Sequence, residues 1–412
     1  MIPRCCATED AKVKLAQEAE TLALLAERAA LEAEAAELQL RAMKAARGED
    51  ISPVEERAAA ERAAADQDEP MALRAPLRWI GPYPSVSLSF PALSSPSQKA
   101  RMLAGDTSAL GVTLDFVIDT AANTNTINAQ VAGPTSQGGL ELSQVGSVAG
   151  GVGAGGAMGG GATYLLGTAE LADVPKEERV PFISALSATA LPVAAPAAAG
   201  LLGLPFLNSF AGGVEFEWGA APVPPGTSVA VALPPASLTF YGDERGTQAS
   251  RAGLRSVEVS VLAGSALPSV ALSVNGVTVP ALLDTGSPIT VLNRAAAEAA
   301  DVRLGASNDA SSQPANPFAR LVAGVQAAAA AAQAETLTVA GVNGPVQLTR
   351  AQEATVSLGD AEFGECRPYV GELPGLSALD GLGASAGPAA ILGTDVLRLR
   401  PRLVYTQQRI YV

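Results

Sequence analysis

The sequence contains an internal repeat, and this constrains the fold more than any other feature. Four segments of the first half recur in the same order in the second: 84–90 (PSVSLSF) with 268–274 (PSVALSV), 116–123 (FVIDTAAN) with 281–288 (ALLDTGSP), 126–128 (TIN) with 291–293 (VLN), and 200–207 (GLLGLPFL) with 390–397 (AILGTDVL). Such self-similarity indicates a duplicated structural unit. We therefore expect two homologous lobes, at residues 76–245 and 252–412, joined by the polar stretch 242–250.

Both predicted lobes have the alternating hydrophobicity of β-strands. Residues 83–90 place Val86, Leu88 and Phe90 on one face, and the segments 112–118, 257–261 and 269–274 also read as strands. Asn275-Gly276 lies between two strand-like segments and predicts a tight hairpin turn. Helical patterns are few, at 294–300 and in the alanine run 327–332. The sequence therefore predicts a mostly β fold.

The composition excludes several kinds of catalysis. The 412 residues include no histidine and only three cysteines, Cys5, Cys6 and Cys366. Without imidazole there can be no Ser-His-Asp or Cys-His catalysis and no histidine-ligated metal. Three cysteines form neither a disulfide framework nor a zinc site. We expect no metal and no cofactor, so carboxylates, hydroxyls, amines or backbone groups must perform any chemistry.

Charge and hydropathy limit the expected partners and compartment. With 27 basic and 41 acidic residues the net charge is −14, and no basic stripe suggests nucleic acid binding. Residues 183–214 are uncharged, but prolines and glycines interrupt them, so we expect no membrane span. The first residues have no apolar signal core, so we expect no secretory signal. The low cysteine content is compatible with an intracellular protein of the cytosol or a plastid.

Residues 1–70 form a predicted charged, helical extension. Within 9–47, apolar residues follow heptad spacing, at Leu15, Ala19, Leu22, Ala26, Ala29, Ala33, Ala36, Leu40 and Met43. A solvated helix and a coiled-coil arm are both compatible with this pattern. The coiled-coil alternative implies self-association, or docking to a partner, through residues 9–47.

Each repeat carries an aspartate at the end of an apolar strand. The two motifs are Asp119-Thr120-Ala121 and Asp284-Thr285-Gly286. Small residues after the aspartate allow a sharp turn that presents backbone N–H groups to the carboxylate. Later in each repeat, Gly203 and Gly393 follow two apolar residues, and such glycines often mark the close approach of another backbone segment.

These motifs resemble those of the aspartic peptidases, and specifically of the retropepsin-like group. Residues 284–287 (DTGS) resemble the active-site motif of that family, and residues 390–393 (AILG) resemble its second signature. The glycine-rich run at 150–156 is similar to the flap tip of retroviral proteases; its glycines are Gly150, Gly151, Gly153, Gly155 and Gly156. A disordered loop is the alternative for this run. The resemblance covers about residues 80–412.

The resemblance implies a bilobal acid-protease-like fold, with β-barrel lobes related by a pseudo-twofold axis. It also implies an aspartic-type endopeptidase in which Asp119 and Asp284 activate a water molecule to cleave a peptide or protein. Two carboxyl groups about 3 Å apart cannot both ionise readily, so they share a proton. The hydroxyls of Thr120 and Thr285 would connect the two loops, and Ser287 would donate to the outer oxygen of Asp284.

The first repeat departs from the family pattern. Ala121 replaces a glycine, so that its Cβ would crowd the partner loop, and Ala122 offers no hydroxyl where the second repeat has Ser287. Because Asp284 has the additional donor, we expect it to have the lower pKa of the two aspartates. The alternative function is a catalytically inactive pseudo-protease that serves as a peptide-binding or scaffolding module. Carboxyl groups close enough to share one water molecule would favour the enzyme.

Overall fold

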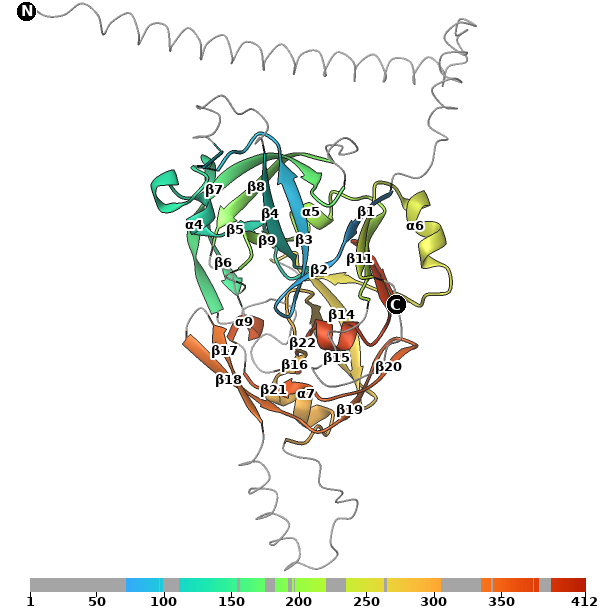
Figure 1. Cartoon of the computed structure of the whole chain (residues 1–412). Helices are drawn as coiled ribbons and strands as arrows, with labels where there is room; N and C mark the ends of the chain where they lie inside the picture. The colour runs from blue at the N-terminus through green and yellow to red at the C-terminus, as the bar shows by residue number, and fades with distance from the viewer. Residues whose placement is uncertain are drawn as a thin grey trace, which may run out of the picture. The chain divides into compact units, whose positions relative to one another are not determined.

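The structure is a computed structural model, and the fold is described for the part of the chain that is placed. The described residues are 72–95, 97–98, 111–153, 156–174, 182–191, 195, 197–219, 235–262, 265–304, 335–341, 344–372, 374–377 and 387–412. Pro70–Val412 forms one compact unit (Figure 1). The predicted helical extension at 1–70, its seam at 9–47 and the alanine run at 327–332 lie outside the described residues.

The described strands form three sheets, so the fold is mostly β, as predicted. The first half contributes a sheet of eight strands, in the order β2 (Arg78–Ile80), β3 (Tyr83–Phe90), β4 (Val112–Ile118), β9 (Gly200–Leu202), β5 (Thr126–Ile127), β8 (Ile183–Ala190), β7 (Gly156–Leu171) and β6 (Ser143–Gly153). The second half contributes ten strands, in the order β17 (Thr336–Gly341), β18 (Gly344–Arg350), β21 (Tyr369–Val370), β16 (Val291–Leu292), β22 (Ala390–Leu392), β15 (Val277–Leu283), β14 (Pro268–Val274), β19 (Ala354–Leu358) and β20 (Ala361–Cys366), with β13 (Ser260–Val261) paired to β14.

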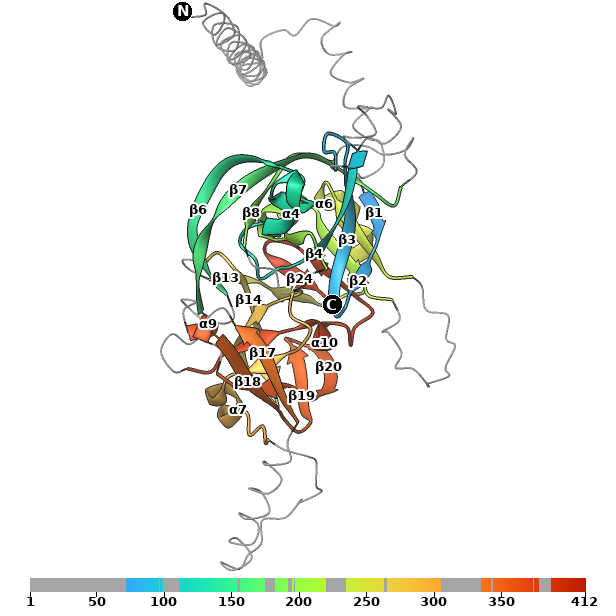
Figure 2. The same cartoon turned by 60° about the vertical axis from the view of Figure 1, so that its left-hand side comes forward.

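The third sheet combines strands from both halves. Its order is β1 (Ala72–Pro76), β11 (Ser237–Tyr241), β10 (Gly213–Glu217), β23 (Arg402–Tyr405), β24 (Arg409–Tyr411) and β12 (Ser256–Glu258). The antiparallel pairing of β10 with β23 joins the two halves by backbone hydrogen bonds. Because each half supplies strands to this sheet, it sets how the halves are placed relative to each other. Figure 2 shows the same arrangement from another side.

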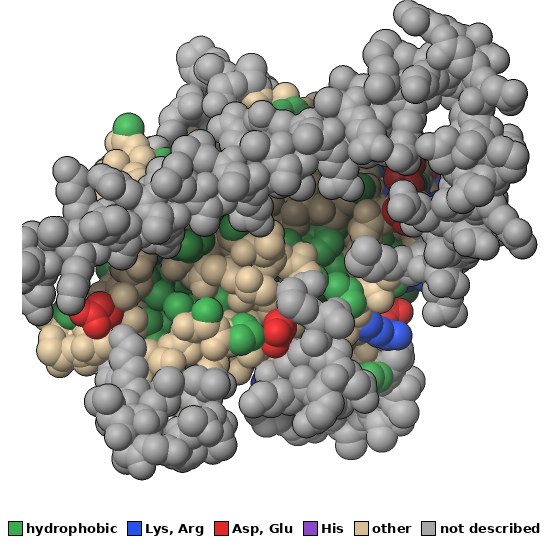
Figure 3. Space-filling view, turned by 90° about the horizontal axis from the view of Figure 1, so that it is seen from above, with side chains coloured by type: hydrophobic (Ala, Val, Ile, Leu, Met, Phe, Trp, Pro, Cys, Tyr) green, Lys and Arg blue, Asp and Glu red, His purple; other side chains and the backbone are tan. Residues whose placement is uncertain are grey.

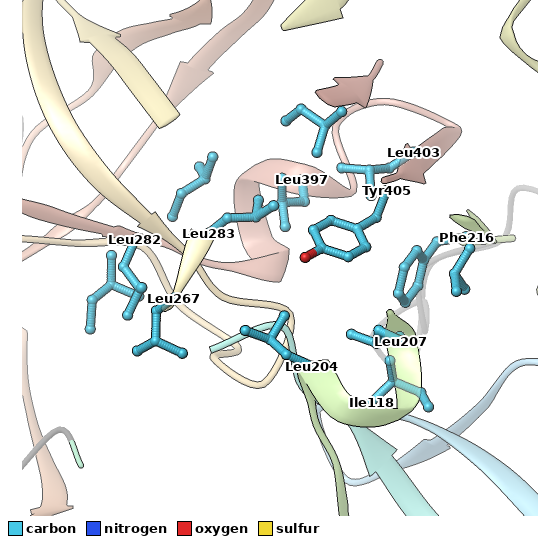
Figure 4. Close-up of a cluster of buried hydrophobic side chains, with 14 of the residues drawn as sticks. Ile118, Leu204, Leu207, Phe216, Leu267, Leu282, Leu283, Leu397, Leu403 and Tyr405 are labelled. Carbon is cyan, nitrogen blue, oxygen red and sulfur yellow. The ribbon is translucent and has the colours of Figure 1, made fainter. Parts of the chain in front are cut away.

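The main hydrophobic core contains residues of this sheet and of both halves. Ile118, Leu204, Leu207 and Phe216 of the first half lie in the same buried cluster as Leu267, Leu282, Leu283, Leu397, Leu403 and Tyr405 of the second (Figure 4). Burial of apolar surface contributes roughly 25 cal/mol for each Å² removed from water. This shared core therefore stabilises the arrangement in which the two halves lie together.

The helices are short, and several begin at side-chain caps. They are α4 (Ala129–Ala132), the 3-10 helix η1 (Thr135–Gln137), α5 (Leu204–Leu207), α6 (Glu244–Arg251), α7 (Arg294–Ala299), α9 (Pro374–Ser377) and α10 (Thr394–Leu397). Asn128 and Asn293, which occupy equivalent places in the repeat, cap α4 and α7. No helix in the described part of the chain is long and apolar enough to cross a membrane.

Two details of local structure were not predicted from the sequence. Most of the polar stretch 242–250, which is expected to join the two lobes, forms α6, because the Asp243 side chain accepts a hydrogen bond from the backbone N–H of Gly246 and starts a helix. In β3, Val86, Leu88 and Phe90 are buried as expected, yet the intervening serines are buried as well. Both faces of this strand are buried, and the alternation of apolar and polar residues could not predict that the serine face is buried as well.

The sequence repeat corresponds to a repeated strand topology. In the first half β4 pairs in parallel with β9, and β5 pairs antiparallel with β9. In the second half β15 pairs in parallel with β22, and β16 pairs antiparallel with β22. The segments that carry the aspartates therefore occupy equivalent places in the two halves, which is the bilobal acid-protease-like arrangement. The lobe boundaries themselves, 76–245 and 252–412, stay predictions.

Candidate active site

Asp119 and Asp284 each occupy the residue that directly follows a central strand. Asp119 follows β4, and its backbone N–H donates to the carbonyl of Leu202 in β9 at 3.0 Å. Asp284 follows β15, and its N–H donates to Leu392 in β22 at 3.1 Å. The backbone of each aspartate is therefore fixed by the strand that it follows and by a hydrogen bond to the neighbouring strand.

The two aspartate loops are connected through Thr120 and Thr285. The Thr120 hydroxyl donates to the carbonyl of Leu283 at 2.7 Å and accepts from the backbone N–H of Thr285 at 3.0 Å. The Thr285 hydroxyl donates to the carbonyl of Ile118 at 2.9 Å and accepts from the N–H of Thr120 at 3.1 Å. Both threonines are fully buried. This reciprocal set of bonds brings the two aspartates together.

The carboxyl groups of Asp119 and Asp284 lie within hydrogen-bonding reach of each other. Each residue keeps some solvent-exposed surface, but dense protein surrounds both carboxyl groups. Burial raises the pKa of Asp119 to about 6, although the backbone N–H of Ala121 and the hydrogen bond from Asp284 oppose this rise. Burial, followed by the negative charge of Asp119, raises the pKa of Asp284 well above its ordinary value. The pair therefore holds one proton more readily than two isolated carboxyl groups would.

The donors around Asp284 differ from the expected ones. The resemblance implied that the Ser287 hydroxyl donates to the Asp284 carboxylate, but it donates to the carbonyl of Ile289 at 2.8 Å instead. The backbone N–H groups of Gly286 and Ser287 lower the pKa of Asp284, but not enough to offset burial. Its Oδ1 is buried and has no hydrogen-bond partner among the described residues. The expected hydrogen bond from Ser287 to Asp284 is therefore wrong, while the order of the two pKa values stays a prediction.

The glycines of both motifs lie where a side chain would collide with a neighbour. A Cβ on Gly286 would lie 2.5 Å from Cγ of Asp119 and 2.6 Å from its Oδ2. A Cβ on Gly203 would lie 2.3 Å from the carbonyl oxygen of Ala122, and one on Gly393 would lie 2.3 Å from that of Ile289. The close approach of backbone to these glycines is therefore what the sequence pattern indicated.

Two further residues support the loops and were not identified from the sequence. Asn125 Oδ1 accepts from the N–H of Gly203 at 3.0 Å, and Thr290 Oγ1 accepts from the N–H of Gly393 at 3.1 Å. In the second half, Asp395 accepts from both the N–H and the hydroxyl of Thr290, at 2.9 and 2.6 Å. Asn125 and Thr290 both lie six residues after their aspartate, which is a signal that the repeat alignment could have provided.

Tyr83 also lies near the aspartates and was not identified from the sequence. Burial and then the negative charge of Asp284 raise the pKa of its phenol. The ring packs in a small apolar cluster with Val117 and Leu201, separate from the main core. These two residues alternate with Ile118 and Leu202 of the main core, so the cluster lies on the opposite face of β4 and β9.

The glycine-rich run forms a hairpin rather than an irregular loop. β6 and β7 pair antiparallel up to Gly153 opposite Gly156. Gly150 and Gly151 lie in β6, whereas Gly155 lies outside the described residues. β7 also lies against α9 of the second half, so the hairpin reaches across from one half to the other (Figures 1 and 2). The hairpin of β17 and β18 is its counterpart in the second half.

The rest of the described surface offers little alternative chemistry. No group of three or more His, Cys, Asp or Glu residues in the described ranges could hold a metal ion. Burial raises the pKa of the half-buried Cys366 thiol to about 12, so it is a poor nucleophile. Seen from above, the described side chains that are visible are mostly hydrophobic or uncharged, with few basic groups (Figure 3).

Comparison with family models agrees with the class that the fold and site define. The family model for aspartyl proteases matches residues 270–331, which include most of β14, all of β15 and the Asp284 loop. No curated protein matches the chain. Among solved structures, the crystal structure of basic 7S globulin from soybean is similar, with a TM-score of 0.40 and 10% sequence identity, over 83% of this chain and 95% of that one. The chain is an aspartic peptidase-like protein.

Proposed function

We propose that this protein is an aspartic endopeptidase that hydrolyses peptide bonds with a water molecule held between Asp119 and Asp284. The observation that carries the proposal is the reach of the two carboxyl groups to each other, on loops connected by the buried hydroxyls of Thr120 and Thr285. Two buried carboxyl groups that share a proton provide a base and an acid in one place.

The unequal surroundings of the aspartates support a division of roles between them. Asp119, whose Oδ1 accepts a hydrogen bond from the N–H of Ala121, acts as the base, which takes a proton from the water as its oxygen attacks the peptide carbonyl carbon. Asp284 keeps its proton and donates a hydrogen bond to the carbonyl oxygen, where negative charge develops. The proton taken by Asp119 then passes to the leaving amine. No imidazole, thiolate or metal is needed for these steps.

The proposed substrate is an extended peptide or protein segment that passes between the aspartates and the β6–β7 hairpin. β6 is an edge strand, and residues 143–149 within it are exposed, so the hairpin has unpaired backbone groups. An extended peptide can satisfy such groups by pairing with them as an additional strand.

The experiment that tests the proposal is digestion of a peptide library by the full chain, at acidic and neutral pH. Cleavage should occur, and a statine-type inhibitor, whose hydroxyl occupies the position of the attacking water, should block it. The rate should fall where the pH exceeds the pKa of both carboxyl groups, because no acid then remains. A library that stays intact at every pH would refute the proposal.

A second candidate is an inactive peptide-binding or scaffolding module with the same fold. The observation that favours it is the sequence Ala121-Ala122 in the first loop, where the second loop has Gly286-Ser287. Such a module would bind the inhibitor and library peptides without cleaving them. Equilibrium binding measured beside the digestion distinguishes the two candidates.

A further inference from the structure

The third residue of each aspartate loop occupies a special place opposite the other loop. In the second loop this residue is Gly286, and a Cβ there would lie 2.5 Å from Cγ and 2.6 and 2.8 Å from the two carboxyl oxygens of Asp119. The Asp119 carboxyl group therefore packs directly against the backbone of Gly286, and this close approach leaves no room for a side chain at residue 286.

The two loops are connected by equivalent contacts, although the Cβ of an alanine cannot lie as close to a carboxyl group as the 2.5 Å found at Gly286. Thr120 and Thr285 exchange equivalent hydrogen bonds, within 2.7–3.1 Å in both directions. The N–H of Ala121 donates to Asp119 Oδ1 at 2.8 Å, and the N–H of Gly286 likewise points to the Asp284 carboxylate. The counterpart of Gly286 beside Asp284 is thus Ala121, which has a methyl group.

A separate observation concerns one oxygen of Asp284, although the N–H groups of Gly286 and Ser287 also act on its carboxyl group. Its Oδ1 is buried and has no hydrogen-bond partner among the described residues, whereas Oδ1 of Asp119 accepts from Ala121. A buried acceptor without a donor is costly for an ionised carboxylate and much less costly for a neutral acid. The difference between the two aspartates coincides with the difference between Ala121 and Gly286.

We infer that the Ala121 methyl group lies against the Asp284 carboxyl group, excludes donors from its buried oxygen and so makes Asp284 the proton-holding member of the pair. Ala121 is then a positioning residue for the proton. Its catalytic meaning rests on the proposed function, but the ionisation of Asp284 can be measured without any substrate.

Few other groups can account for a protonated Asp284 carboxyl group. Among the described residues, the titratable groups that interact with it are Asp119 on the opposite loop and Tyr83 on β3. The negative charge of Asp119 also favours a protonated Asp284, while the N–H groups of Gly286 and Ser287 favour the ionised form. These groups are unchanged when only the Ala121 methyl group is removed, so its contribution can be isolated.

The test is a pH titration of full-length protein with ¹³C-labelled aspartate carboxyl groups, followed by NMR. Asp119→Asn and Asp284→Asn assign the two resonances. We expect Ala121→Gly to lower the pH at which Asp284 titrates by about one unit or more, because water or a donor gains access to Oδ1. Ala121→Ser should lower it as well, since the added hydroxyl can donate. Ala122→Gly removes a methyl group from the same turn and should leave the Asp284 titration unchanged.

The outcomes separate this inference from the proposed function. An Asp284 titration that is the same in the parent, Ala121→Gly and Ala121→Ser would overturn the inference, even if the parent cleaves peptides. An equal shift in Ala122→Gly would also overturn it, because loop loosening would then be the cause. A shift confined to the Ala121 variants supports the inference even if no peptide is cleaved, in which case the proposed function alone fails.

Discussion

The aspartate loops of the two halves share a backbone and differ in their side chains. In both, the aspartate N–H donates to the neighbouring strand, and the threonine hydroxyl donates to a carbonyl of the other half. In both, the side chain six residues after the aspartate accepts a hydrogen bond from the N–H of a buried glycine. The first loop has Ala121 and Ala122 where the second has Gly286 and Ser287. The shared contacts place the two carboxyl groups, while the differing residues make their environments unequal.

A second difference concerns the side chain that accepts a hydrogen bond from the N–H of the glycine after β9 or β22. In the first half this side chain is Asn125, which accepts from Gly203 and whose amide also donates to the carbonyl of Ser187 at 3.2 Å. In the second half Thr290 serves Gly393 and is itself held by Asp395, whose place in the first half is taken by Pro205. The same backbone requirement is therefore met by one long side chain in one half and by two shorter ones in the other.

The largest expected effect comes from removing one of the shared contacts. Thr120→Val leaves the Leu283 carbonyl and the Thr285 N–H without partners in a buried place. We expect the free energy of unfolding to fall by about 2–5 kcal/mol, measured by urea denaturation. Thr285→Val should cost a similar amount. Thr124→Val, which removes only a long bond to Asn125 in the same loop, is the control and should cost much less. Losses for Thr120→Val near those of the control would contradict the connection between the loops.

The unequal carboxyl environments should appear in the pH dependence of stability. A carboxyl group whose pKa is raised in the folded state stabilises the fold below its unfolded pKa, and this contribution is lost as the pH rises through the folded pKa. For Asp119 the contribution is therefore complete below pH 3.8 and lost as the pH approaches about 6. We expect a fall of up to about 3 kcal/mol over this range. Asp119→Asn should flatten this part of the urea-unfolding profile, and an unchanged slope would count against a raised pKa.

A smaller effect should follow from giving the second loop the side chain of the first. Gly286→Ala places a Cβ 2.5 Å from Cγ of Asp119, which is closer than a van der Waals contact allows, so the loops must separate. We expect a loss of about 1–3 kcal/mol in the free energy of unfolding. Ala121→Gly, the reverse exchange in the first loop, should cost no more than about 1 kcal/mol. Equal costs for the two exchanges would show that the loops are not unequal in the way described. Thermal unfolding followed by circular dichroism measures both.

The smallest expected effect comes from the second difference between the halves. Asp395→Asn keeps one oxygen acceptor for Thr290 but replaces the other with a donor. We expect a loss of about 1 kcal/mol, because one of the two hydrogen bonds survives. Asp395→Ala should cost more, since both are lost. If Asp395→Asn and Asp395→Ala are equally and fully stable, Thr290 does not depend on Asp395.

The comparison also shows which features the sequence could predict. The repeat predicted equivalent aspartate loops because the matched residues are the ones that enter strands, turns and close backbone contacts. The acceptor of the Ser287 hydroxyl could not be predicted, because whether it donates to Asp284 or to the carbonyl of Ile289 depends on the local conformation of the loop. Asn125 and Thr290 were missed because residues of different type perform the same task.

The six-stranded sheet could not be predicted either. Its central pairing joins β10 of the first half to β23 of the second, and such long-range pairing leaves no periodic pattern in the sequence. The raised pKa of Asp284 depends on burial, which outweighs the effect of the donors of its loop. Motifs specify local turns and contacts, whereas burial and distant pairing follow only from the packed chain.

The most direct test of the account is single-turnover cleavage of a library-derived peptide by the parent protein, Asp119→Asn and Asp284→Asn, with folding of each variant checked by circular dichroism. Because the water needs both a base and an acid, we expect each substitution to slow cleavage by at least about a thousandfold while peptide binding remains. Full activity in folded Asp119→Asn would contradict the account, since the first half would then contribute no catalytic group.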